Sequence, residues 1–166
     1  MQTIQILDIK PFMQLLFQTN QLDTYEFVSA NLKTDMSYTL DGHLNLDFFE
    51  EEERLMLHEE HSPFIFWKFA KEKIFQLIKG KKTPSLLKIV LKLSPAATEQ
   101  LLQDTRSSLT KHDIDGMFIN ILFQDHALSV ICGISYKIFT MEKHLEQEFT
   151  TTIVSLFRQN HITIQQ

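Results

Sequence analysis

The stretch from residue 128 to residue 140 constrains the fold most, because its side chains alternate with a period of two. Such alternation is typical of a β-strand that buries one face. A second β-type run, 117–124, precedes it, and Gln124-Asp125-His126 between the two runs indicates a turn. We therefore expect an antiparallel hairpin here. The apolar set is Leu128, Val130, Cys132, Ile134, Tyr136 and Ile138, which alternate with Ser129, Gly133, Ser135 and Lys137.

Four further strands are predicted in the first hundred residues. Residues 3–7 form the first, and residues 25–40 hold two more, separated by a turn near Thr34-Asp35. Asp41-Gly42 is predicted to be a tight hairpin turn. Alternation over 87–93 predicts the fourth, a half-exposed strand. Within residues 25–40, one face of the sheet is expected to carry Glu26, Val28, Ala30 and Leu32.

Helices are predicted between the strands from apolar spacing and from residues that start or stop a helix. The loop 106–116 is expected to be polar and to end in a turn at Asp115-Gly116. The predicted helices run from Asp8, as N-cap, to about Thr19; over 48–60, with Asp47 and Glu50 as a capping box; from Ser62-Pro63, as N-cap and first helical residue, to Gly80; from Ser94-Pro95 to about Thr105; and over 142–159.

This order of elements predicts an α+β fold. Two βαββ-like segments build an antiparallel sheet, a two-helix insertion separates them, and a C-terminal helix follows. We expect a single domain over residues 1–166, with the helical insertion at 48–80. The similar runs QLLFQT and QLLQDT suggest a pseudo-repeat of 3–46 and 86–140, although short matches of this kind also arise by chance.

Composition favours a cytoplasmic globular protein. Apolar residues make up 43% of the 166, and 14 phenylalanines provide material for a large core. One cysteine, Cys132, excludes an internal disulfide framework and a cysteine-based zinc cluster. No signal peptide and no run of about 18 apolar residues is present, so no membrane association is expected.

Charge is sharply segregated in the middle of the chain. Residues 41–60 hold eight acidic residues and one arginine, and residues 68–92 hold eight lysines and one glutamate. Opposite blocks either pair within the fold or form two separate binding faces. The net charge of −5 argues against a generally basic nucleic-acid binder but leaves room for a local basic patch.

Several catalytic and cofactor motifs are excluded, and no cofactor is expected. Gly80-Lys81-Lys82-Thr83 resembles the end of a P-loop, but Phe75 occupies the position of its first glycine. The four glycines are too far apart for a dinucleotide loop, and 112–116 lacks ligands that a calcium loop needs. Cys132 lies on the apolar face of its strand, which favours a buried, inert thiol. No serine lies in a Gly-x-Ser-x-Gly elbow.

Three histidines are weak candidates for a metal site. His58 and His61 are three residues apart, unlike the four-residue spacing of the His-Glu-x-x-His zinc motif. His43 would join them only if the fold brings it close. A solvated acidic helix end is the simpler interpretation, and a metal-dependent enzyme that uses these residues is an alternative hypothesis.

The basic block provides the main binding candidate. Lys79, Lys81, Lys82 and Thr83 form a loop, and Phe69 and Phe75 fall outside the apolar stripe of the preceding helix. Cations at a helix C-terminus also interact favourably with the helix dipole, so the cluster has a purely structural explanation too. The block contains no arginine, which weakens the case for phosphate or base recognition.

Parts of the chain together resemble an uncharacterised bacterial family, found mainly in clostridial-type Gram-positive anaerobes and catalogued as a domain of unknown function. The resemblance spans nearly the whole chain and implies a bacterial, single-domain, cytoplasmic protein. It implies no activity and no catalytic residues. The residues that carry it are 40–45 (LDGHLN), Trp67-Lys68, 75–84 (FQLIKGKKTP), 139–143 (FTMEK) and 145–147 (LEQ).

The sequence therefore favours a non-catalytic protein that binds a partner with an acidic surface through the basic loop. The first alternative is a nucleic-acid accessory protein of clamp-like or single-strand-binding type, and the second is the metal-dependent enzyme. An enzyme is the less favoured class, because no catalytic constellation is visible. The sequence leaves the oligomeric state open.

Overall fold

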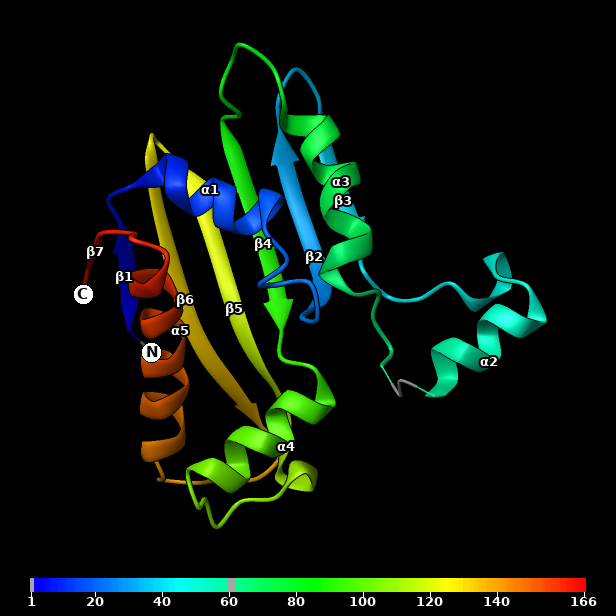
Figure 1. The fold of residues 1–166 in the computed structure, drawn as a ribbon, viewed down its shortest axis with the longest axis vertical. Helices are drawn as coiled ribbons and strands as arrows, with labels where there is room; N and C mark the ends of the chain where they lie inside the picture. The colour runs from blue at the N-terminus through cyan, green and yellow to red at the C-terminus, as the bar shows by residue number, and fades with distance from the viewer. Residues whose placement is uncertain (1, 60–61) are drawn as a thin grey trace.

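A seven-stranded antiparallel sheet forms the centre of the protein, in the strand order β3-β2-β4-β5-β6-β1-β7 (Figure 1). The structure is a computed structural model that describes residues 2–59 and 62–166, with the backbone alone at 58 and 59. It confirms the predicted α+β class. The strands are β1 (Thr3–Ile6), β2 (Glu26–Lys33), β3 (Ser37–Asp41), β4 (Leu86–Lys92), β5 (Ile114–Gln124), β6 (Ala127–Tyr136) and β7 (Ile164–Gln165). The helices are α1 (Ile9–Gln18), α2 (Glu51–Glu59), α3 (Trp67–Ile78), α4 (Pro95–Asp104) and α5 (His144–Gln159), with 3-10 turns η1 (Leu46–Phe48) and η2 (Lys111–Asp113).

The predicted hairpin is the long central pair β5 and β6. Its register places Phe123 opposite Leu128, and the turn consists of Asp125 and His126. Both turn residues have positive φ, 53° and 61°. A two-residue turn of this hand matches the twist of the flanking strands, which explains why the hairpin is tight without a glycine.

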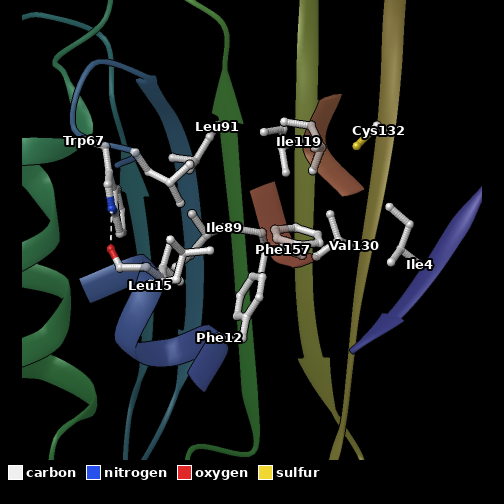
Figure 2. Packing of buried hydrophobic residues seen from close by; sticks show 14 of the residues in the cluster. Ile4, Phe12, Leu15, Trp67, Ile89, Leu91, Ile119, Val130, Cys132 and Phe157 are labelled. Atoms are coloured by element: carbon white, nitrogen blue, oxygen red, sulfur yellow. Dashed lines mark hydrogen bonds between the residues drawn. The ribbon is translucent and has the colours of Figure 1, made fainter. Parts of the chain in front are cut away.

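One face of the sheet carries the hydrophobic core, and α1, α3 and α5 cover it (Figures 1 and 2). Phe12 of α1 packs edge-on against Phe157 of α5, with ring centroids 5.5 Å apart. Trp67 of α3 is fully buried, and its Nε1–H donates to the Leu16 carbonyl of α1 at 2.8 Å. These contacts hold α1, α3 and α5, which are distant in sequence, together as one layer over the sheet. The opposite face remains half-exposed, as is common for antiparallel sheets.

A β-bulge in β2 corrects the predicted face of that strand. The register with β4 shifts between Phe27 and Ser29, so Val28 is the extra residue. Because of this shift, Phe27 joins Ala30 and Leu32 on the core face, and Glu26 lies on the opposite face. The prediction that one face carries Glu26 and Val28 together with Ala30 and Leu32 was therefore wrong for Glu26 and Val28.

The segment after β3 also differs from the prediction. Asp41-Gly42 does not form a hairpin turn, because the chain continues in extended form and His43 pairs with Phe64 in an isolated bridge. A Cβ on Gly42 would overlap the backbone carbonyl of Phe27, so the close backbone approach explains the glycine. The β2–β3 connection lies at residues 34–36, which confirms the turn predicted near Thr34-Asp35.

Two predicted helix starts were misplaced. The helix expected over 48–60 begins at Glu51, and Asp47 lies in the 3-10 turn η1 instead of acting as its N-cap. Ser62 starts no helix. Its hydroxyl donates to the Phe64 carbonyl at 2.9 Å, and residues 62–66 form an extended strap before α3 begins at Trp67. The N–H of Phe27 donates to the Ile65 carbonyl at 2.8 Å, which fastens the strap to β2.

The remaining differences are local. Ser94 caps α4 as predicted, by accepting from the Ala97 N–H at 3.2 Å. Asp8 makes no cap. Its carboxylate accepts from the Thr163 N–H at 2.8 Å, and this hydrogen bonding lowers the pKa of Asp8. The turn predicted at Asp115-Gly116 was wrong, because both residues lie in β5. The pseudo-repeat stays a prediction.

Candidate functional site

A cavity of about 400 Å³ opens between α1 and α3, above the start of β4. Its floor is apolar, because half-buried side chains of both helices meet buried residues of the sheet there. The floor includes Met13, Phe17, Phe75, Ile78, Leu87 and Phe123. Phe17 and Phe75 face each other with ring centroids 5.7 Å apart. We call this site the basic groove, for the charges on its rim.

The rim of the basic groove is cationic. Lys10 of α1 stands on one side, and Lys79 and Lys82, at and beyond the C-terminal end of α3, stand on the other. All three are exposed, and none pairs with an acidic side chain within the described part of the chain. Gly80, with φ of 148°, provides the turn that carries Lys82 and Thr83 back over the cavity.

The structure brings together four of the six residues that the sequence singled out. Phe75, Lys79, Lys82 and Thr83 all line the basic groove. The other two point elsewhere, since neither Lys81 nor Phe69 lines it. Phe69 is 54% exposed, and the ammonium of Lys68 lies 4.7 Å from the centre of its ring.

Sequence reasoning missed the second wall of the groove, which α1 provides. Met13 and Phe17 lie one helical turn apart, outside the buried stripe of Phe12, Leu15 and Leu16. Lys10 and Gln14 repeat the same four-residue spacing and line the groove too. Apolar residues that recur off the buried face of a helix are the signal that points to such a surface.

The acidic and basic blocks do not pair within the part of the chain that the structure describes. The ion pairs there are Asp41 with His43, Asp23 with Lys71, and Glu26 with Lys92, and none joins Glu50–Glu53 to a lysine. Figure 1 shows why, because α2 stands away from the sheet and from the other helices. Among the described residues, the glutamates of α2 therefore do not neutralise the lysines of the basic block.

A buried carboxylate was also missed. Glu26 is fully buried, and within the described part of the chain neither of its oxygens has a hydrogen-bond partner. Lys92 Nζ lies 3.8 Å from Glu26 Oε2, and it also lies over the rings of Phe64 and Phe118, at 5.5 and 5.9 Å. Burial raises the pKa of Glu26, and Ser62 and Lys92 offset only part of the effect. The bulge at Val28 creates this arrangement, which no periodic pattern reveals.

Comparison with known proteins gives one match. The model of a family of unknown function, DUF5721, matches residues 14–165. The chain belongs to this family. No curated protein and no solved structure matches the DUF5721 protein. The predicted resemblance to a family of unknown function is thus confirmed, its bacterial, clostridial-type origin stays a prediction, and the comparisons supply no activity.

The histidines of the DUF5721 protein give no metal cluster in the described residues. His43 Nδ1 lies 2.7 Å from Asp41 Oδ1, and the N–H of His43 donates to the same oxygen at 2.9 Å. These contacts lower the pKa of Asp41, with the backbone hydrogen bond as the larger cause. His61 and the side chain of His58 lie outside the described residues. Over the described ranges, no helix is long and apolar enough to cross a membrane.

Cys132 of the DUF5721 protein lies on the core face of β6 with none of its surface exposed. Burial, with a smaller effect from the charge of Glu146, raises the pKa of its thiol to about 12. A thiol that stays protonated near neutral pH is a poor nucleophile. The predicted location on the apolar face is confirmed.

Proposed function

We propose that this DUF5721 protein is a non-catalytic binding protein, and that its basic groove takes a segment of a protein partner that carries both apolar and acidic side chains. The observation that carries the proposal is the combination of an apolar cavity with three lysines on its rim that have no acidic partner among the described residues. Apolar floors with a few convergent polar groups are the usual form of a recognition site.

Binding is favoured over catalysis by what lines the groove. Its described walls contain no carboxylate, imidazole or thiol, and Thr83 provides the one hydroxyl. General acid–base or nucleophilic chemistry needs such groups within hydrogen-bonding reach of one another. The floor and rim can instead bury an apolar side chain and attract an acidic one.

The apolar floor and the cationic rim are expected to contribute differently to the free energy of binding. Burying one large apolar side chain in the floor contributes roughly 1.5–3 kcal/mol. An exposed lysine–carboxylate pair adds only about 0–1 kcal/mol, but it steers encounter and selects against basic segments. Affinity is therefore expected from apolar contacts, and selectivity for acidic partners from Lys10, Lys79 and Lys82.

Matched labelled peptides test the proposal on the full chain. One peptide alternates Leu or Phe with Glu, and the second replaces every Glu by Lys. By fluorescence anisotropy, we expect the acidic peptide to bind wild type at least about tenfold more tightly than the basic one. Lys79→Glu/Lys82→Glu should abolish this preference. Lys81→Glu is the matched control, since Lys81 lies in the same loop but outside the groove.

Two results would overturn the proposal. One is the lack of a preference that depends on Lys79 and Lys82, seen either as equal binding of both peptides or as a preference that survives the double charge reversal. The other is tighter, salt-sensitive binding of a single-stranded DNA oligonucleotide, which would favour the nucleic-acid class.

We further propose that the protein works in a bacterial cytoplasm, where its single buried thiol would stay reduced.

A further inference from the structure

Residues 46–59, which comprise η1 and α2, form an acidic arm (Figure 1). Its η1 end lines a cavity beside α3, and α2 stands off the rest of the fold. Its apolar side chains are not used in the core. Phe48 is 81% exposed, Leu55 63% and Met56 71%. Isolated exposed apolar residues are common, but three on one short element together with a run of glutamates indicate a surface that is normally covered.

The arm holds a defined shape of its own. Arg54 Nε donates to the carbonyls of Leu46 and Phe49, at 2.7 and 2.9 Å, and so fastens α2 back onto η1. The N–H of Glu50 donates to the carboxylate of Glu53 at 3.2 Å, one half of a capping box. The helix is therefore preorganised, which lowers the entropy that docking would cost.

Acidic and apolar side chains share one side of α2. Glu51 and Glu52 lie four residues before Leu55 and Met56, so each glutamate stands one turn from an apolar partner on the same helix face. The basic groove presents the complementary set, with lysines on its rim and an apolar floor. The arm matches in chemistry the ligand class that the groove is proposed to take.

The arm cannot readily reach the groove of its own chain. Its base is fixed where His43 pairs with Phe64 and where the Leu44 N–H donates to the Pro63 carbonyl at 2.9 Å, beside the start of α3. The groove lies on the side of α3 that faces α1, whereas Phe48 and Phe49 of the arm line a different cavity with Ile74 and Leu77. Figure 1 shows α2 pointing away from the α1 side of α3.

We infer that the occupant of the basic groove is the acidic arm of a second copy of this chain. Leu55 and Met56 enter the apolar floor, and Glu51 and Glu52 meet Lys79 and Lys82. Because each copy offers one arm and one groove, reciprocal exchange closes a two-fold dimer in which both arms and both grooves are filled. The inference rests on the proposed function, since it names the partner of the same groove.

Complementary charge reversals test the inference by analytical ultracentrifugation. Wild type should shift from 19.5 kDa toward twice that mass as concentration rises over about 5–500 μM. The arm variant Glu51→Lys/Glu52→Lys and the groove variant Lys79→Glu/Lys82→Glu should each associate at least about tenfold more weakly. An equimolar mixture of the two variants should recover dimers, because each reversed arm then meets a reversed groove.

The controls distinguish this contact from nonspecific association. Lys81→Glu should leave association unchanged, while Leu55→Ser/Met56→Ser should weaken it without altering charge. Raising salt to about 0.5 M should also weaken it by screening. A wild type that stays monomeric at the highest concentration, or a mixture that behaves like its separate components, would overturn the self-docking.

The outcome is distinguishable from failure of the proposed function. If the acidic peptide binds the groove while the wild type remains monomeric, the groove serves another acidic partner and only the self-docking is lost. If the chain dimerises but the groove reversals leave dimerisation unchanged, the self-docking is wrong, and the peptide assay decides the groove on its own.

Discussion

Lys92 approaches the fully buried Glu26 to 3.8 Å between Nζ and Oε2, yet neither Glu26 oxygen accepts a hydrogen bond from the described residues. The pair connects β2 with β4 on the face of the sheet opposite the core. Because burial raises the pKa of Glu26, the folded chain binds its proton more tightly than the unfolded chain does. The contribution of Glu26 to the free energy of unfolding is therefore largest below its unfolded pKa and is lost as pH rises through the raised folded pKa.

We expect Lys92→Met to expose this dependence on pH. At about pH 8 the variant leaves a buried carboxylate without its counter-charge, which costs roughly 3 kcal/mol, the lower end for such pairs because Lys92 remains 17% exposed. At about pH 5 the loss should be smaller, since Glu26 can take up a proton. Urea denaturation at both pH values measures the difference. The double variant Glu26→Gln/Lys92→Met should lose this dependence, and an equal loss at both pH values in the single variant would contradict the assignment.

Two glycines should differ in their tolerance of alanine. Gly42→Ala places a methyl group against the backbone carbonyl of Phe27, which cannot move without opening the strap, so we expect a loss of about 3 kcal/mol or more. Gly116→Ala meets the end of the flexible Lys92 side chain and the ring of Phe118, and should cost about 1–2 kcal/mol. Thermal unfolding ranks the two variants, and the reverse order would show that the strap is not fixed at Gly42.

Alanine substitutions of Phe75 and Phe69 should distinguish a residue packed in the groove from one on the surface. Phe75→Ala removes the ring that packs against Phe17 and is expected to destabilise the fold by about 2 kcal/mol. Phe69→Ala removes a ring that is 54% exposed and should cost less than about 1 kcal/mol. Chemical denaturation gives both values. Comparable losses would mean that Phe69 packs against more than the Lys68 ammonium.

Cys132 should be inert until the sheet opens. With its thiol pKa raised to about 12 and none of its surface exposed, we expect no reaction with Ellman's reagent at about pH 8 in the folded protein. In denaturant the thiol should react fully. The reaction rate against denaturant concentration then reports the opening of β6, and rapid labelling of the native protein would disprove the burial.

Strand periodicity predicted the sheet well where one face is apolar. Leu128, Val130 and Cys132 all lie in the core, as do Leu87, Ile89 and Leu91 of β4. The caps succeeded where chemistry and context agreed, as at Ser94 before α4. Local signals of this kind are read from neighbouring residues alone, so a single sequence contains them.

Predictions failed where distant backbone decides the local structure. Ser62-Pro63 has the chemistry of a helix start, but hydrogen bonds to β2 hold the following residues extended. Asp41-Gly42 has the chemistry of a turn, but Gly42 is required by contact with Phe27. In the groove, the residues from α3 and its loop were found because they cluster in sequence. Lys10, Met13 and Phe17 were not, because they come from a helix more than fifty residues earlier.

The strand order has a consequence for synthesis of the chain. Thr3 of β1 pairs with Ile131 of β6, and Gln5 pairs with Gln165 of β7. β1 is therefore synthesised long before β6 and β7 exist to pair with it, and α1 is likewise synthesised long before Phe157. Because α1 forms one wall of the groove, a chain that is still being synthesised would have no finished groove until α5 holds α1 in place.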